Sequence, residues 1–497
     1  MSMHKHVVDF DGIAPECWLR LFLRKPEDFT KWFDRLLSRS PLMAGLSLPA
    51  LASGKESAVS ELDKIRLIVP QTSLVALADI VLSEFLNSFI NDQFKGLGDH
   101  FYIGARKYTQ PLEVAFAGQL MIDKGLDLRS EGCLGQADIQ QYFDNLPFQQ
   151  LVRFCKTRGL PSPNIACVIR HQLITSLYVH VSGASRVHMV RNRARGGLTG
   201  SRVALALARI PVEDMCFKFN DVWRTHAFAG TICVATWIDN LFVFGKTLTS
   251  TLTVLRESET FLENVWKLKF KPSSKQLMVP FAQPCTDMLE EYPVVSAFKI
   301  LGHLLIPDGG SQACRDSTIR ACWRSFWANV HRSKQQFRGR QVLLGRLNRF
   351  VLPVLTFRMP RWSFVESHAK QLDSIQRKMI SIILALRPEV GESVEQFVRR
   401  RAREVARIQR SQVPWSVRWS RAVLAWGRHV ERNTANNCFA SRLLEVRSQD
   451  ELRWRRASFS NRPNTRSFSG FNPRRWLDGL DLCRQKHAPH DELPPSP

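Results

Sequence analysis

The sequence lacks the features that mark secreted and membrane proteins. Its 11 cysteines include no Cys-x-x-Cys pair, which indicates neither a zinc knuckle nor a disulfide framework. No run of 18 apolar residues is present, and the first residues, MSMHKHVVDFDG, contain acidic residues where a signal peptide needs an apolar stretch. We therefore expect an intracellular protein with no membrane partner.

Acidic residues are scarce in the last part of the chain. Overall, 70 Lys and Arg outnumber 45 Asp and Glu and leave a net charge of +25. Residues 311–497 hold 36 basic and 15 acidic side chains, whereas residues 1–310 hold 34 and 30. Of the 36 basic residues 32 are Arg, whose planar guanidinium suits phosphate oxygens and stacks on bases. The excess predicts a polyanionic partner, bound mainly by the C-terminal part.

Enough apolar residues are present, 44%, to form a core, and their pattern changes along the chain. Up to about residue 130, helical patterns alternate with Pro, Ser and Gly, which predicts short helices. From 131 to 310, runs such as TICVATW, LFVFG and FKILGHLLIP alternate with helical stretches, which predicts an α+β fold with a mixed sheet. From 311 the chain is helical and Arg-rich, and residues 458–497 are expected to form a mobile basic tail.

Two carboxylates stand out by their local context. Asp239 lies between the runs 231–237 and 241–245, which predicts a hairpin with Asp239 at or near its tip, although Asp is also an ordinary turn residue. Asp138 follows a short apolar stretch, and a helix is expected to start near Asn145 with Pro147 in its first turn. A carboxylate at a strand end that faces another on a hairpin tip can clamp two Mg²⁺ ions for phosphoryl transfer.

These segments resemble the reverse transcriptases of non-LTR (LINE-type) retrotransposons. Residues 138–145, DIQQYFDN, are similar to the first palm motif, D-I-x-x-x-F-D, and residues 237–240, WIDN, stand in the place of the Y-A-D-D hairpin. Between them RGGLTGS (195–201) is similar to R-G-x-P-Q-G-S. Further likenesses follow the family's order: KIRLI (64–68) and FYIGARKYT (101–109) in the fingers, LKFKPSSK (268–275) in the fourth palm motif, and FKILG (298–302) in the primer-grip strand.

The resemblance implies a right-hand polymerase fold with an Arg-rich α-helical extension. Residues 1–130 would form an N-terminal segment and the fingers, 131–310 a palm with an antiparallel sheet, 311–360 thumb-like helices, 361–457 the basic helical extension and 458–497 the tail. The implied activity is RNA-directed DNA synthesis. It would use dNTPs, an RNA template and a DNA primer, with two Mg²⁺ ions as cofactor and Mn²⁺ as the alternative ion.

The resemblance also implies roles for single residues. Asp138 and Asp239 would hold the metals with the Ile139 carbonyl, beside Asn240, and Phe143 would be the steric gate against a ribose 2′-OH. The other implied nucleotide-binding residues are Lys64, Arg66, Gly196, Thr199, Gly200 and Lys275, and the implied primer-grip residues are Leu301 and Gly302. Each has a plain structural alternative: Phe143 as core, the glycines as loop residues, Arg66 and Lys275 as solvated charges.

Several residues depart from the family's pattern. Asn240 replaces the second hairpin carboxylate, Leu198 and Thr199 replace the Pro-Gln pair, and Leu67 replaces the fingers proline. Since hard divalent ions prefer carboxylates, we expect weaker metal binding and slower synthesis. Two other hypotheses therefore stay open: an inactive reverse-transcriptase-like protein that binds nucleic acid, and an RNA binder of the intron-maturase kind.

The Arg-rich part contains a regular basic pattern. In residues 398–410, one helical face is expected to carry Arg399, Arg403, Arg407 and Arg410, with Val405 and Ile408 packing on another side. That face predicts contacts to a nucleic-acid backbone, with a solvated surface as the alternative. Trp415, Trp419 and Trp426, at spacings of 4 and 7, predict a core seam. The basic residues around Arg453, Arg455 and Arg456 predict either a nuclear-import signal, hence a nuclear protein, or a nucleic-acid patch.

Overall fold

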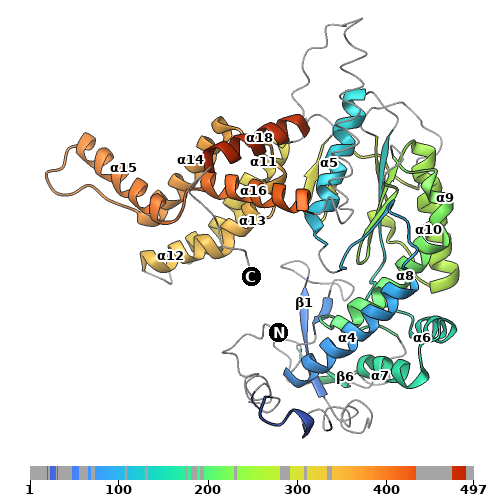
Figure 1. Cartoon of the computed structure of the whole chain (residues 1–497). Helices are drawn as coiled ribbons and strands as arrows, with labels where there is room; N and C mark the ends of the chain where they lie inside the picture. Colours follow the sequence, from blue (N-terminus) through green and yellow to red (C-terminus); the bar gives the residue numbers. More distant parts are fainter. Residues whose placement is uncertain are drawn as a thin grey trace, which may run out of the picture.

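The structure is a computed structural model of the whole chain. It describes the segments 20, 23–28, 31, 47–54, 65–68, 73–106, 109–128, 132–173, 176–180, 187–190, 195–228, 232–279, 291–306, 311–332, 339–432 and 473–487. Its helices and strands alternate up to residue 306 and are followed by helices (Figure 1). The α+β class predicted from the sequence is confirmed.

A five-stranded sheet forms the centre of the molecule. Its strand order is β3 (Phe101–Ile103), β7 (Val234–Trp237), β8 (Asn240–Gly245), β4 (Cys133–Asp138) and β9 (Gln276–Met278). All neighbouring pairs are antiparallel except β3 and β7, which are parallel. The runs TICVATW and LFVFG thus supply the two strands of the predicted hairpin, and the sheet is mixed, as the apolar runs predicted. The antiparallel palm sheet implied by the resemblance is wrong for one pair, because β3 runs parallel to β7.

Both faces of this sheet are covered, because side chains alternate between two apolar clusters along each strand. On β8, Leu241 and Val243 join a cluster with α8 (Arg202–Lys218) and α10 (Leu248–Trp266). Phe242 and Phe244 join a second cluster with α5 (Pro111–Leu128) and the C-terminal helices. Figure 1 shows α5 on one side of the sheet and α10 on the other. Burial on both faces explains why the β8 sequence is apolar without alternation.

A second sheet and several helices adjoin the first. The second sheet has the order β2 (Ile65–Ile68), β1 (Ser47–Gly54), β5 (Ser176–His180) and β6 (Val187–Val190). The helices are α4 (Ser73–Gln93), α6 (Phe148–Thr157), α7 (Ser162–Leu173) and α9 (Asn220–Arg224). With 21 and 18 residues, α4 and α5 are longer than the short helices predicted for residues 1–130. Pro111 is the first residue of α5, and Gly118 and Gly125 lie within it without ending it.

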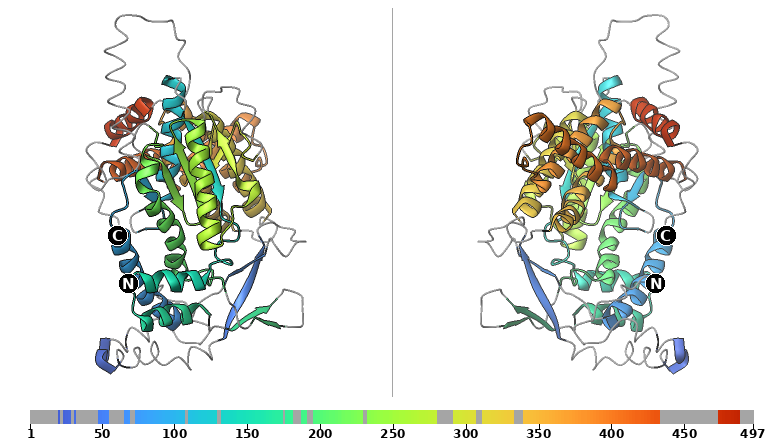
Figure 2. Two further views of the ribbon diagram at one scale, coloured as in Figure 1. Left: turned by 90° about the vertical axis from the view of Figure 1, so that its right-hand side faces the viewer. Right: turned by 90° about the vertical axis from the view of Figure 1, so that its left-hand side faces the viewer.

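The C-terminal part is helical, as predicted. Its α-helices are α11 (Ser311–Ser325), α12 (Arg340–Arg346), α13 (Leu352–Thr356), α14 (Glu366–Leu384), α15 (Val394–Ser411), α16 (Trp415–Arg432) and α18 (Pro473–His487). Phe326–His331 and Leu347–Val351 are π-helical. The predicted seam is confirmed, since Trp415, Trp419 and Trp426 are all buried. Figure 2 shows these helices gathered on the side of the molecule opposite α10.

The expectation of a mobile tail over 458–497 is wrong for residues 473–487. These residues form α18, and its Trp476, Leu480 and Cys483 are buried. The Trp476 indole lies 4.9 Å from the Phe116 ring, centroid to centroid, and its Nε1 donates to the Pro360 carbonyl over 3.1 Å. The apolar positions recur at i, i+4 and i+7, a pattern hidden by the surrounding Arg, Pro and Ser residues.

The boundaries predicted at 310 and 360 do not separate independent cores. One apolar cluster runs from α5 through β10 (Phe298–Ile300) and β11 (His303–Leu305) into α11, α14, α16 and α18. Arg361, expected in a basic extension, is 1% exposed and donates to Gln119 Oε1 over 3.1 Å and to the Leu304 carbonyl over 2.6 Å. Helices α16 and α18 therefore pack against α5, where Phe116 contacts Trp426 and Trp476.

The segment FKILGHLLIP is a hairpin and not one continuous strand. β10 and β11 pair antiparallel, and Leu301 and Gly302 form the turn between them. Both turn residues have positive φ, 46° and 87°, as type I′ turns require. The two predicted primer-grip residues therefore occupy a turn, because Leu-Gly can adopt the left-handed conformation that reverses the chain here.

Candidate active site

The two predicted carboxylates lie where β4 ends and β8 begins, at one end of two inner strands of the central sheet. We call this end of the strands the sheet edge. Asp138 ends β4 and lies directly across from Asn240, the first residue of β8. The next amide along the chain, Ile139 N–H, donates to the Asp239 carbonyl over 2.8 Å. Directly opposed residues on neighbouring strands present their side chains on the same face. The side chains of Asp138 and Asn240 therefore share a face, and Asp239 directly precedes Asn240 with its carbonyl bonded to the residue after Asp138. Asp138 and Asp239 are each half-buried.

A two-residue turn holds Asp239 in place. Trp237 pairs with Asn240, so Ile238 and Asp239 are the turn residues, and Asn240 belongs to the strand. Ile238 has φ +57°, a left-handed conformation that costs a β-branched residue about 1–3 kcal/mol. The Asn240 amide donates from Nδ2 to Asp239 Oδ1 over 2.9 Å. Asn240 therefore orients the carboxylate beside it.

The donor set at this edge fits a hard divalent cation. Two carboxylates, the Asn240 amide and the main chain at Ile139 all offer oxygen atoms, which Mg²⁺ and Mn²⁺ accept. No group of three or more His, Cys, Asp or Glu side chains gathers at one point within the described residues. Mg²⁺ is usually held by one or two carboxylates, with water and substrate phosphates as its other ligands. Asp138 and Asp239 match that pattern.

The segment after α10 supports Asp138 from its other side. The Lys271 amide donates to the Asp138 carbonyl over 2.8 Å, and the Asp138 amide donates to Ser274 Oγ over 2.9 Å. Ile139 and Phe270 form an antiparallel bridge, so Asp138 and Lys271 face each other. The Lys271 side chain is exposed. The sequence analysis did not single out Lys271 or Ser274. The turn-forming Pro-Ser-Ser that follows Lys271 was the feature that could have indicated them.

Lys275, the lysine predicted to meet the leaving group, is held in ion pairs. Its Nζ lies 2.8 Å from Glu259 Oε2 and 2.7 Å from Glu291 Oε1. Burial alone would lower the pKa of Lys275, but hydrogen bonds and charges from both carboxylates outweigh it and raise that pKa. The ammonium group of Lys275 is therefore held by two glutamates, whereas the main chain of Lys271 contacts Asp138.

The predicted glycine loop packs against the segment that follows Asp138. The Gly197 amide donates to the Phe143 carbonyl over 2.7 Å, and the Gly196 amide donates to the Leu146 carbonyl over 3.1 Å. Phe143 itself is half-buried against the cluster of α8 and α10. The helix predicted from Asn145 begins at Phe148, with Pro147 as its N-cap instead of in its first turn. The structure thus joins the loop and the Asp138 segment into one unit.

Gly196 provides a test of the contact between the glycine loop and the segment that follows Asp138. Its φ is +89°, and a Cβ there would lie 2.8 Å from the Asp144 carbonyl oxygen. Gly196→Ala is expected to lower the free energy of unfolding by about 2 kcal/mol, measured by urea denaturation. Gly159→Ala is the matched control, because Gly159 has φ +82° with nothing within 4 Å of its Cβ. Equal losses in both variants would contradict the contact with Asp144.

Of the other predicted nucleotide-binding residues, two lie in the glycine loop, and the side chains of the other two lie outside the described part of the structure. Thr199 and Gly200 lie in the same loop, and Gly200 has φ +105°. Arg66 lies on β2 opposite Ser53, but its side chain lies outside the described part of the structure. Lys64 falls outside the described residues, as do Arg453 and Arg455. Their predicted roles stay predictions.

The predicted basic face exists on α15. Arg399, Arg403, Arg407 and Arg410 are all exposed, while Val405 is buried and Ile408 packs against the core. Arg399 pairs with Glu395 over 2.5 Å and Arg407 with Glu404 over 2.9 Å. Such exposed pairs contribute little and leave the guanidinium accessible. Figure 1 shows α15 extending away from the rest of the molecule.

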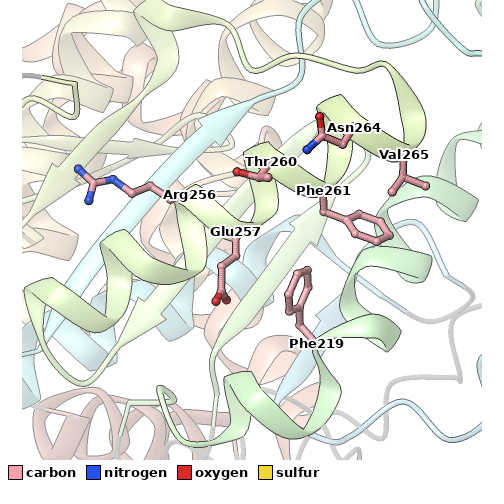
Figure 3. A pocket seen from close by; sticks show the side chains of 7 residues that line it. All are labelled: Phe219, Arg256, Glu257, Thr260, Phe261, Asn264 and Val265. Atoms are coloured by element: carbon pink, nitrogen blue, oxygen red, sulfur yellow. The ribbon is translucent and has the colours of Figure 1, made fainter.

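A shallow hollow of about 380 Å³ lies elsewhere, on the outer side of α10. Phe219 and Phe261 point toward each other in it, and Arg256, Glu257 and Val265 line it from α10 (Figure 3). None of the predicted site residues contributes to it. This hollow is therefore separate from the strand ends that carry Asp138 and Asp239.

No protein-family model and no curated protein matches the sequence. Solved structures with similarity include an apo telomerase from Candida tropicalis truncated from its C-terminal domain, with 9% identity and TM-score 0.37, covering 56% of this chain and 59% of that one. Another is the telomerase from Candida albicans in complex with a fragment of telomeric RNA, with 8% identity and TM-score 0.38, covering 72% and 62%.

The chain therefore spans about three fifths of each of these two structures. TM-scores this low do not establish a shared fold. Among the described helices, none is both long and apolar enough to cross a membrane.

Proposed function

We propose that this chain is a reverse-transcriptase-type polymerase that extends a DNA primer on an RNA template. The observation that carries the proposal is the antiparallel register of β4, β8 and β7, in which Asp138 ends β4 opposite Asn240, and Asp239 lies in the turn just before Asn240. The order of the motifs along the chain, similar to LINE-type reverse transcriptases, agrees with this geometry. The polymerase would belong to a non-LTR retrotransposon.

The chemistry would be transfer of a nucleotide from a dNTP to a primer. A bond forms between the primer 3′-oxygen and the α-phosphorus, the bond to pyrophosphate breaks, and the hydroxyl proton passes to water. Asp138 and Asp239 would hold two Mg²⁺ ions, which stabilise the charge on the reacting oxygens when bound. Lys271, exposed beside Asp138, would offset negative charge on the triphosphate, a role that the sequence suggested for Lys275.

Template binding would involve the helical part of the chain. The surplus of positive charge lies beyond residue 310, and the α15 face is exposed and basic. Arginine on such a face neutralises backbone phosphates and releases counterions, whatever the base sequence. An intracellular, nuclear location would fit this partner.

Primer extension tests the proposal most directly. The purified chain is incubated with an RNA template, a DNA primer, the four dNTPs and Mg²⁺, and a parallel reaction contains EDTA. We expect extension that depends on the metal. Template binding without any extension, in Mg²⁺ or in Mn²⁺, would overturn the polymerase and favour the second hypothesis.

The second hypothesis is an inactive reverse-transcriptase-like protein that binds nucleic acid. Asn240 favours it, because the residue directly across from Asp138 carries no negative charge for a divalent ion. An RNA binder of the intron-maturase kind is a variant of this hypothesis. Both keep the basic helical part and lose the chemistry.

The α15 face can be tested through the salt dependence of binding. Arg403 and Arg410 are exposed, and we expect Arg403→Gln with Arg410→Gln to weaken RNA binding and to reduce the slope of log K against log salt by roughly 1.5–2. The matched control changes Arg224 and Arg256, exposed on α9 and α10. Filter binding at several salt concentrations measures both. An unchanged slope in the α15 variant would contradict a phosphate-contacting role.

A further inference from the structure

A buried carboxylate on α4 contacts the start of α8, far from it in the sequence. Asp79 is 1% exposed. Its Oδ1 accepts from Ser201 Oγ over 2.5 Å, and its Oδ2 accepts from the Arg202 amide over 2.5 Å. The Val203 amide donates to Oδ1 over 3.3 Å. Asp79 thus satisfies helix-end amides that have no partner within α8 itself.

Neighbouring side chains complete the network and connect it to the glycine loop. His171, on α7, lies with Nε2 2.9 Å from Asp79 Oδ1. Gln172 Nε2 donates to Ser201 Oγ over 2.9 Å, and Gln172 Oε1 accepts from the Leu198 amide over 2.9 Å. Ser201 Oγ also accepts from the Ala204 amide as the N-cap of α8. Three helices therefore meet at the end of the loop 195–201.

The charge of Asp79 strengthens this arrangement. Burial alone would raise the pKa of Asp79, but hydrogen bonds from His171, Ser201 and the Arg202 amide, with the charge of His171, lower it below its ordinary value of 3.8. The carboxylate is therefore ionised at neutral pH. An ionised acceptor at a helix N-terminus makes shorter and stronger hydrogen bonds than a neutral one.

The other end of the same loop lies against the Asp138 segment. Gly196 and Gly197 donate to main-chain carbonyls of Leu146 and Phe143, as described above. Movement at Ser201 would therefore be transmitted along a short loop to Phe143 and Leu146, in the segment that follows Asp138. The loop is fixed at one end by Asp79 and Gln172, and at the other by the main chain after Asp138.

We propose that Asp79 is a positioning residue that holds the loop 195–201 in the shape that receives the incoming nucleotide, acting through Ser201 and the first amides of α8. The inference depends on the proposed function, because it assigns the nucleotide to this loop. Asp79 does not touch the reacting atoms. Nothing in the family likeness of the motifs points to this residue, which lies outside all of them.

Asp79→Asn tests the inference, with Asp92→Asn as the matched control. Asp92 lies on the same helix and is exposed. An amide at position 79 turns one acceptor into a donor that faces other donors. We expect the KM for dNTP in primer extension to rise about tenfold, the effect of losing one hydrogen bond to a charged group, while kcat changes less than about twofold. Hydrogen exchange in residues 195–205 should become faster, with residues 239–245 unchanged.

A second pair of variants keeps the test decisive if Asp79→Asn does not fold. Ser201→Ala removes the hydroxyl that donates a hydrogen bond to Asp79, and Ser201→Thr keeps a hydroxyl at this position. We expect the alanine variant to raise the KM for dNTP and the threonine variant to recover the parent value. A loss of kcat with no change in KM, or equal behaviour of both variants, would overturn the inference.

Failure of the proposed function would be visible separately. If the parent makes no DNA, equilibrium binding of a dNTP with Mg²⁺ replaces KM as the measured quantity. Weaker dNTP binding in Asp79→Asn than in Asp92→Asn would then support the inference although the polymerase proposal had failed. Equal binding in both variants, or no binding by the parent, would overturn it.

Discussion

Asp138→Asn is expected to reduce primer extension by about 10³-fold or more. The change keeps the size of the side chain but removes one of the two carboxylates at the sheet edge. Because position 240 carries an uncharged Asn opposite Asp138, the remaining Asp239 would have to hold the divalent ions by itself. Single-turnover extension on an RNA template measures the loss.

The control for this prediction is again Asp92→Asn, which changes the same charge on an exposed site. Circular dichroism and RNA binding should be the same for both variants and the parent. If Asp138→Asn keeps at least a tenth of the parent's rate, Asp138 does not hold a metal ion, and the proposed metal site at Asp138 and Asp239 is wrong.

Asn240→Asp is expected to have the second large effect, in the opposite direction. A carboxylate at this position would lie directly across from Asp138 and beside Asp239, which raises the negative charge available to two divalent ions. We expect extension to become about tenfold faster at limiting Mg²⁺, because a better ligand set at a metal site raises its affinity for the ion by about that factor.

The same variant should depend on metal for its stability. The Asn240 amide now donates to Asp239 Oδ1, and a carboxylate there would remove that hydrogen bond and add a like charge. Without Mg²⁺ the Tm of Asn240→Asp should therefore fall below that of the parent. Saturating Mg²⁺ should recover it, because binding to the folded state stabilises that state. Asn240→Ala is the control, since it removes the hydrogen bond without adding charge. An equal response of both variants to Mg²⁺ would contradict a metal site at this edge.

Local sequence patterns were sufficient for the elements that carry the site. The apolar runs on either side of Asp239 predicted the β7–β8 hairpin, and the apolar stretch before Asp138 predicted a strand end. The tryptophan spacing predicted the buried seam on α16. In each case the periodicity of neighbouring residues decides which side of a helix or strand is buried, so it can be recognised without knowing the partner.

Residues that depend on distant partners could not be predicted in this way. Lys275 carries the motif's charge, but Glu259 and Glu291 decide where its ammonium lies. Asp79 belongs to no motif, and its importance arises from a helix end more than 120 positions away. Lys271 became a candidate because a bridge sets it across from Asp138. Such pairings depend on strand register and helix packing, which a local pattern does not contain.

The sequence by itself determined the α+β class, the basic character of the C-terminal part, and the hairpin that presents Asp239. The tertiary structure decided that Asp138 and Asp239 are neighbours, that the C-terminal helices share a core with α5, and that α18 packs in that core. The physical reason is the range of the interactions. Hydrophobic periodicity and turn preferences act over a few residues, whereas register and core membership arise when segments far apart in the chain bury their surfaces together.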